Sequence, residues 1–368
     1  MLNLKISYPI GIDINGNDLY ATQFRHSRRG PVLKGILHRE IPEQSEDESN
    51  SDNEILSLLK ELAKYDRFRG RKVVVRLPPR HVYSFPIRFQ LKENESLEGA
   101  IVRETREYLP FPVEEAVIDY PSIMASPSEG KERYRVNVVA VRRELVERYL
   151  LLLKRVGFTV EAIETGISAL IRLHNHLRAA PSEPTILCHI DRNRTMLSAL
   201  TKEGIVAELN AQWGIQRTLR RLQANLELGN DHSKAGFLLR KFGLTYEERK
   251  IAEAEVDFSD MNDESMQRAV YQIIAPSVEE LVNELHKTIS YLRSEASEAS
   301  FQEIHIYGQS GIIRHLDRFV ARRLNIKTRV MNPLAEFPLT TEGLFLADAD
   351  GSPFAGALGL GLRKLAWL

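Results

Sequence analysis

The stretch PIGIDINGNDLYATQF, residues 9–24, decides the fold of this chain. Residues 9–14 form an apolar run that predicts a β-strand, and residues 19–24 supply a partner strand. The turn formers Asn, Gly, Asn and Asp at positions 15–18 separate the two runs and favour a tight reversal. Residues 32–39 predict a third strand. The sequence therefore predicts that the chain opens with a meander of paired strands.

The same order of elements returns in the second half of the chain. The predicted strands there are residues 185–190, 195–200, 205–209 and 303–307, with turns at 191–194 and 202–204. The late strand ends in Gly308-Gln309-Ser310-Gly311. The repeat concerns topology and not residue identity, and Ala179-Ala180-Pro181-Ser182 marks a boundary between the two halves.

A compact unit interrupts the first half. Its predicted elements are a strand at 85–89, a helix at 97–108, strands near 117–124 and 135–141, a helix at 146–156 and a closing strand at 158–164. Pro110 and Pro112 end the first helix, and Gly157 suits the C′ position of the second. The order β-α-β-β-α-β is the split βαβ arrangement.

Three further segments complete the predicted organisation. Residues 43–54 contain six acids and no base, which predicts a solvated loop. Apolar spacing over residues 278–292 predicts an amphipathic helix. The segment from Ser352 to Arg363 predicts a buried helix, with Ser352 as N-cap and Pro353 at N1.

The chain is therefore expected to have an α/β fold of two halves with an insertion. The expected parts are a first half at 1–83, completed by the C-terminal helix at 352–364, an inserted subdomain at 84–165, and a second half at 183–351 with a helical subdomain around 214–300. This division agrees with the length of 368 residues, which exceeds that of one ordinary domain.

Composition excludes several classes of function. Fifty basic and fifty acidic residues give a net charge of zero, so no protein-wide field favours nucleic acid or an anionic bilayer. The single cysteine, Cys188, indicates a reducing compartment, and no secretory signal or long apolar run is present. The sequence predicts a soluble, cytoplasmic protein. The basic run Arg67, Arg69, Arg71, Lys72, Arg76 and Arg80 predicts a solvated face and not a nucleic-acid site. Contact with an anionic inner leaflet or an acidic neighbour is the alternative.

Two meander-type halves and a buried C-terminal helix resemble the actin-like ATPase superfamily, with its ribonuclease H-like fold. The stretch ETREYLPFPVEEAVIDY, residues 104–120, resembles the signature of PilM, the cytoplasmic actin-like component of type IV pilus assembly. The likeness extends over residues 10–363. It implies a cytoplasmic scaffold that docks the N-terminal peptide of a bitopic inner-membrane partner, PilN, and reaches the membrane only through that partner. Pilus motor components and a second copy of the chain are further candidate partners.

The superfamily holds Mg²⁺-ATP between two β-turns, and the resemblance implies where such a site would lie. The matching positions are Asp13, Gly16, Asn17, Asp191, Gly308, Ser310 and Gly311. However, Asn15 stands where the family has glycine, and the second turn, residues 189–195, lacks the family's glycine and carries Arg192 and Arg194. Gly236 and Leu239 replace the polar partners of the adenosine. We therefore expect no catalytic residue, no metal and no ATP cofactor. An ATP-gated switch and a kinase of the same superfamily are the alternatives.

The resemblance also implies a peptide-binding groove in the inserted subdomain. The candidates are Tyr108, Leu109, Pro110, Phe111, Val113 and Tyr120, because an extended peptide needs apolar and aromatic pockets. The same residues could instead form the core and turns of the subdomain. For Tyr108 and Phe111 the sequence does not favour either interpretation.

Overall fold

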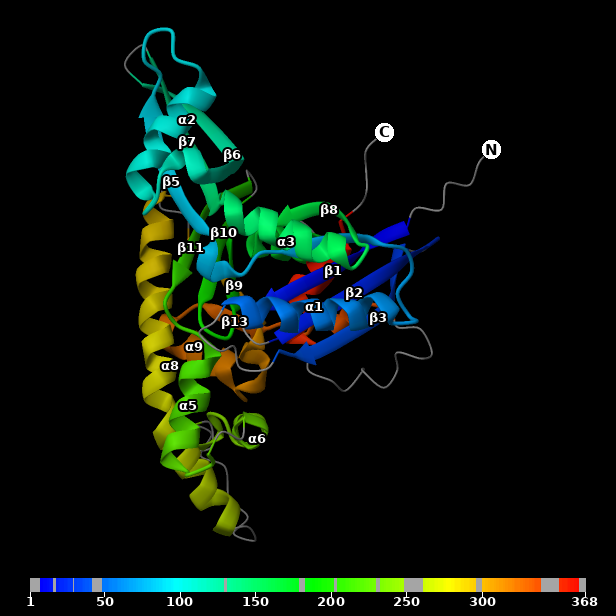
Figure 1. Ribbon diagram of the computed structural model, residues 1–368. Coiled ribbons are helices and arrows are strands. Elements are labelled where there is room, and N and C mark those ends of the chain that lie inside the picture. The colour runs from blue at the N-terminus through cyan, green and yellow to red at the C-terminus, as the bar shows by residue number, and fades with distance from the viewer. Residues whose placement is uncertain are drawn as a thin grey trace. The chain divides into compact units, whose positions relative to one another are not determined.

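The computed structural model describes residues 7–15, 18–28, 30–41, 48–128, 131–178, 183–201, 204–229, 232–247, 261–295, 300–338 and 351–363. They belong to two compact units. Unit 1 comprises Met1–Arg172, Gly204–Asn210 and Ala357–Leu368, and unit 2 comprises Leu173–Glu203 and Ala211–Gly356. Figure 1 shows the course of the chain through these elements.

The first sheet has the strand order β3-β2-β1-β4-β8. Its strands are β1 (Ser7–Asn15), β2 (Asp18–Ser27), β3 (Gly30–Glu40), β4 (Lys72–Arg76) and β8 (Thr159–Glu164). β1, β2 and β3 are antiparallel, which confirms the predicted meander, and β4 and β8 extend the sheet in parallel. The helices α1 (Glu48–Lys64) and α3 (Arg143–Arg155) share one apolar core with these strands (Figure 1).

The other face of this sheet carries α4 (Gly166–Leu177) and α10 (Ala355–Gly361). Gly11 allows α10 to approach β1 closely, because a Cβ atom at Gly11 would lie 2.3 Å from the carbonyl oxygen of Ala357. The Thr22 hydroxyl donates a hydrogen bond to the same oxygen (2.9 Å). The predicted burial of the C-terminal helix is confirmed, since Leu358 and Leu360 are fully buried.

The inserted segment forms an antiparallel sheet of order β5-β7-β6. Its elements are β5 (Tyr83–Gln90), α2 (Leu97–Thr105), β6 (Ala116–Ser128) and β7 (Lys131–Arg142), with 3-10 turns η1 (Pro79–His81), η2 (Arg106–Tyr108) and η3 (Val113–Glu115). α2 packs on one face of this sheet, around Ile87, Ile101 and Val136. These elements match the predicted strand, helix and strand pair.

The predicted split βαβ arrangement of this subdomain is wrong at its closing strand, β8. β8 pairs with β4 in the first sheet and does not join β5, β6 and β7. The reason lies in α3, whose buried residues Tyr149, Leu152 and Leu153 pack in the core of the first sheet. Gly157 follows with a φ of 82°, as the predicted C′ residue of α3. The chain therefore leaves the helix beside β4.

The second five-stranded sheet repeats the order of the first. Its order is β11-β10-β9-β12-β13, with β9 (Thr185–Ile190), β10 (Thr195–Thr201), β11 (Gly204–Ala211), β12 (Glu303–Gly308) and β13 (Lys327–Val330). The remaining elements are α5 (Ile215–Asn225), α6 (His232–Lys241), α8 (Met261–Glu295), η5 (Gln309–Ile312), α9 (Leu316–Leu324), η6 (Pro333–Glu336) and η8 (Ser352–Phe354). The predicted internal repeat of topology is confirmed.

Three predicted boundaries are wrong. α1 begins at Glu48, inside the run expected to be a loop; its polar first turns are joined to α3 by the Asp52–Arg148 ion pair, and residues 42–47 lie outside the described part. α8 begins at Met261, well before the predicted helix at 278–292, and contains Pro276. The carbonyl of the adjacent Ser277 accepts a hydrogen bond from Trp213 Nε1 (2.7 Å). Ser352 is the first residue of η8 and not an N-cap, since that turn begins after Gly351.

Candidate functional site

Three parallel strands of unit 1 carry charged residues side by side at or near their carboxyl ends. Asp13 on β1 is in register with Arg76 on β4, and Arg76 is in register with Glu164 on β8. The carboxyl edge of a parallel sheet is where α/β proteins commonly hold ligands. Any contribution of unit 1 to nucleotide binding is therefore expected at this edge.

Asp13 already has a cationic partner at this edge. Arg76 Nη1 lies 3.1 Å from Asp13 Oδ2 and 3.2 Å from Oδ1. The side chains of Arg76 and Asp13 are 0% and 1% exposed, so the pair is buried. Because a buried carboxylate requires a compensating charge, the guanidinium supplies locally what a divalent cation would otherwise supply.

Glu164 is also neutralised within unit 1. Arg172 Nη1 and Nη2 donate to its two carboxylate oxygens at 2.9 and 2.8 Å, and Arg363 donates to Oε1. Arg172 also donates to the carbonyl of Gly359 in α10 (2.8 Å). These contacts tie β8, α4 and α10 together.

Glu208 is a third carboxyl group beside this cluster. Burial raises the pKa of Glu208 to about 7, although nearby Arg76 and a hydrogen bond from Ser84 act in the lowering direction. Sequence reasoning missed both Arg76 and Glu208. Arg76 was wrongly assigned to a solvated basic face; the available signal was a charged residue at the end of the apolar run Val73–Val75.

The turn between β9 and β10 in unit 2 is packed closed. Asp191 N–H donates to the Arg194 carbonyl (2.8 Å), as expected for a tight hairpin. The carbonyls of Asp191 and Arg192 accept hydrogen bonds from Ile215 and Gln216 in the first turn of α5 (3.2 and 2.9 Å). The first turn of α5 therefore directs these N–H groups to the turn and not to an anion.

Two glycines fix the geometry around this turn. A Cβ atom at Gly214 would lie 2.4 Å from the Arg192 carbonyl oxygen. Gly308 has a φ of 89°, and a Cβ there would lie 2.3 Å from the Ile190 carbonyl oxygen. The fold therefore brings Gly308 beside the strand that leads to Asp191.

The other sequence candidates for nucleotide binding are distributed as follows. Ser310 and Gly311 lie in η5, and Gly16 and Asn17 lie outside the described residues. In α6 the buried residues include Gly236 and Leu239, where the superfamily places polar groups. Mg²⁺-ATP is the ligand that the superfamily implies, and Asp13, paired with buried Arg76, does not fit a magnesium-organising role.

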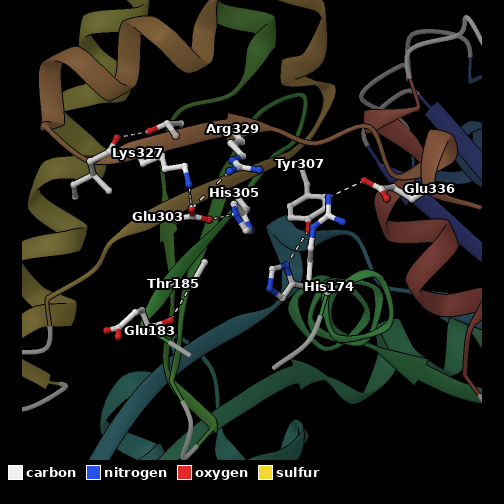
Figure 2. A network of polar contacts seen from close by, with 12 residues as sticks. His174, Glu183, Thr185, Glu303, His305, Tyr307, Lys327, Arg329 and Glu336 are labelled. Carbon is white, nitrogen blue, oxygen red and sulfur yellow. Dashed lines mark hydrogen bonds and ion pairs between the residues drawn. The ribbon is translucent and has the colours of Figure 1, made fainter. Parts of the chain in front are cut away.

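A polar network of unit 2 runs along β12 (Figure 2). His174 Nδ1 and the Tyr307 hydroxyl are 3.0 Å apart, and His305 Nε2 lies 2.9 Å from Glu303 Oε2. Burial, together with the nearby His305, lowers the pKa of His174 to about 4. The His174 imidazole is therefore neutral near pH 7, and its contact with the Tyr307 hydroxyl links α4 to β12.

Unit 1 also contains a cavity of about 530 Å³ near the base of the inserted sheet. Its apolar lining comes from Tyr83, Leu145, Leu151 and Leu152. Its charged lining comes from Asp52, Arg142, Glu144, Arg148 and Arg155, and His81 adds a polar ring. Leu151 is 57% exposed, which leaves apolar surface accessible at the cavity.

The cavity adjoins the segment that the sequence singled out. Phe111 is buried, meets Tyr83 edge to face at a centroid distance of 5.5 Å, and lies under the Arg142 guanidinium (4.2 Å). Arg142 is further held by Glu115 (2.7 Å). Arg148 on α3 pairs with Asp52 on α1 (2.7 Å).

The other predicted peptide-binding residues differ in accessibility. Tyr108 is 52% exposed and stacks on Phe85 at 4.7 Å, whereas Val113 is buried. Pro110 is exposed, Leu109 is half-buried, and Tyr120 packs against the core of the inserted subdomain. Tyr108 and Pro110 are thus accessible, and Phe111 and Val113 hold the segment in place.

Comparisons with known proteins define the class. A solved PilM-PilN type IV pilus biogenesis complex contains a chain with a TM-score of 0.77 and 22% identity, covering 97% of this chain and 98% of that one. The ethanolamine utilization protein EutJ from Carboxydothermus hydrogenoformans gives 0.52 at 10% identity, covering 96% and 89%. MreB 5 of Spiroplasma citri bound to AMPPNP gives 0.50 at 10% identity, covering 95% and 93%. The chain is a protein of the actin-like ATPase fold.

The family follows from the sequence match. The model of the family described as type IV pilus assembly protein PilM matches residues 11–365, so the chain belongs to that family. This result confirms the resemblance read from residues 104–120. No helix among the described residues combines the length and the apolar character that a bilayer-spanning segment requires.

Proposed function

We propose that this chain is a scaffold of type IV pilus assembly that docks the N-terminal peptide of a PilN-like inner-membrane protein and does not hydrolyse ATP. Family membership and the similarity to a chain from a PilM-PilN complex support the assignment to this machine. The observation that carries the docking role is the cavity of about 530 Å³ in unit 1. In this proposal the chain works at the cytoplasmic face of the membrane and is held there by its partner.

The cavity suits an extended peptide for two reasons. Its apolar lining, with Leu151 and Leu152 of α3, can take the aliphatic side chains of a bound segment. Its arginines, among them Arg155, can pair with carboxylate or carbonyl oxygens of the same segment. Phe111 contacts Tyr83 of the cavity lining and holds the segment in place, so in this proposal the exposed residues Tyr108 and Pro110 of the same segment extend the binding surface.

Absence of ATP chemistry is supported by the Arg76–Asp13 pair. The Arg76 guanidinium, 3.1 Å from the carboxylate, already supplies Asp13 with a buried compensating charge. The closed turn at Asp191 points the same way. The alternative is an ATP-gated scaffold, which the AMPPNP-bound MreB 5 structure favours by fold alone.

Peptide binding tests the docking role. Fluorescence anisotropy with a labelled N-terminal peptide of the PilN-like protein should give saturable binding, and Leu151→Asp should weaken it at least tenfold. Leu150→Asp is the matched control, because Leu150 is also an exposed leucine of α3 but does not line the cavity. Equal effects of the two substitutions would contradict the docking site.

A second measurement addresses the ATP-gated alternative. A fluorescent ATP analogue at micromolar concentration with Mg²⁺ should show no saturable binding to the purified chain. Binding that unlabelled ATP displaces would replace the proposal by the ATP-gated scaffold.

A further inference from the structure

Helix α3 contributes a continuous stripe of side chains to the wall of the cavity in unit 1. Four of its residues line the cavity at successive intervals of four, three and four positions: Glu144, Arg148, Leu151 and Arg155. Residues three and four positions apart are neighbours on one face of a helix. The stripe therefore begins with an acid and ends with a base, and an arginine and a leucine lie between them.

The other arginines of the lining already have acidic partners. Arg148 is held by Asp52, with Nε 2.8 Å from Oδ1 and 3.0 Å from Oδ2. Arg142 is held by Glu115 (2.7 Å) and lies over the Phe111 ring (4.2 Å). Because each of these arginines has a carboxylate of the chain itself, neither requires one from a bound segment.

The two ends of the stripe differ in this respect. Both Glu144 and Arg155 are exposed, and neither forms a hydrogen bond or ion pair with any residue in the described part of the chain. A segment that fills the cavity removes water from these two groups, and a charge that loses water without gaining a partner opposes binding. A complementary segment therefore brings a cationic group to Glu144 and an anionic group to Arg155.

The distance between the two charges sets the spacing of their partners. Arg155 follows Glu144 by eleven positions of α3, which corresponds to about 16 Å along the helix axis. An extended peptide rises about 3.3 Å per residue, so about five residues span the same length. Leu145, Leu151 and Leu152 line the same wall and can contact apolar residues between the two charges.

We propose that Glu144 and Arg155 recognise the order of charges in the docked segment. A basic residue of the segment lies at Glu144, an acidic residue about five positions away lies at Arg155, and apolar residues lie between them. This inference rests on the docking role proposed above and adds a criterion of specificity to it. A segment that enters in the opposite direction places like charges together at both ends, so the pair also fixes the direction of the bound chain.

Fluorescence anisotropy with the labelled N-terminal peptide of the PilN-like protein tests this charge order on the full-length chain. Glu144→Gln and Arg155→Gln should each weaken binding about threefold, which is typical of the loss of one exposed ion pair. The reversed pair, Glu144→Lys with Arg155→Glu, should weaken binding about tenfold or more, because attraction becomes repulsion at both ends.

Two residues of the same helix provide a matched control. Glu147 and Lys154 are exposed on α3 and do not belong to the cavity lining. Glu147→Lys with Lys154→Glu makes the same exchange of charges on the same helix and should bind the peptide like wild type. Circular dichroism verifies that each variant is folded.

Peptide variants identify the partner of each charge. When the basic residues of the peptide are replaced by glutamine, Glu144→Gln should have no further effect, whereas Arg155→Gln should still weaken binding about threefold. Replacement of the acidic residues should give the converse result.

The outcomes separate this inference from the docking role itself. If the wild type binds the peptide and Leu151→Asp weakens binding, but the reversed pair binds like wild type or no worse than the control, the charge order is wrong and the docking role stands. A bound peptide that lacks either charge would also overturn the charge order. Absence of binding to the wild type would overturn both.

Discussion

Replacement of Arg76 by methionine provides the sharpest test of the charged edge of unit 1. The substitution keeps most of the side-chain volume but leaves the Asp13 carboxylate buried without the Arg76 guanidinium. At 3.1 Å, and with an effective dielectric constant near 20, the Coulomb attraction of the pair is about 5 kcal/mol. Removing one partner of a buried pair typically costs about 3–5 kcal/mol. We expect Arg76→Met to lower the free energy of unfolding by about 3–5 kcal/mol.

The double variant distinguishes charge from packing. Arg76→Met with Asp13→Asn removes both formal charges of the pair, so it should regain much of the loss, because no Asp13 carboxylate remains buried without its guanidinium. Urea unfolding followed by circular dichroism measures each variant. The transition of unit 1 is the relevant one if the two units unfold separately.

An exposed ion pair serves as the reference. Arg39 Nη2 on β3 and Glu61 Oε1 on α1 lie 2.6 Å apart, and both side chains are solvent-accessible. Arg39→Met should therefore cost less than about 1 kcal/mol. The reasoning is refuted if Arg76→Met costs no more than Arg39→Met, or if the double variant is no more stable than Arg76→Met alone.

Three further predictions concern backbone fit and titration. Gly308→Ala should lower the free energy of unfolding in urea by at least about 2 kcal/mol, because the new Cβ would meet the Ile190 carbonyl. Gly229→Ala, also at positive φ but in open space, should cost about 1 kcal/mol, and similar losses in the two variants would argue against the close contact at Gly308. The stability difference between Glu208→Gln and wild type should be constant below pH 4.5 and should shift in favour of the variant as the pH rises to about 7. The reason is that folded wild type retains a proton on Glu208 that the unfolded chain releases, and a pH-independent difference would exclude the raised pKa. As the pH falls from 6.5 to about 4, His174 should lower the free energy of unfolding of the wild type by on the order of 3 kcal/mol, because the unfolded chain binds a proton on this imidazole more readily than the folded chain. Chemical unfolding of His174→Gln should lack this part of the pH dependence.

The local pattern was sufficient for most elements. Glycine and asparagine at 15–18 separate two apolar runs, and the strands form there as antiparallel neighbours. Gly157 ends α3 with the positive φ that its position predicts. Such features depend on neighbours in sequence, so the residues themselves carry the information.

Part of the candidate site was also accessible from sequence. Asp13 was recognised through a family resemblance, and the segment around Phe111 through its aromatic and proline residues. Neither Arg76 nor Glu208 was assigned a role, because the pairing of Arg76 with Asp13 joins residues 63 positions apart.

The sequence by itself determined the two meander-like halves, the helix and strand types and the buried C-terminal helix, because periodicity and turn residues act locally. Only the tertiary structure decided that β8 joins β4, that Arg76 is buried against Asp13, and that α3 and the inserted sheet border one cavity. Sheet membership and burial depend on long-range packing and desolvation, so the same strand or arginine can have a different role in another environment.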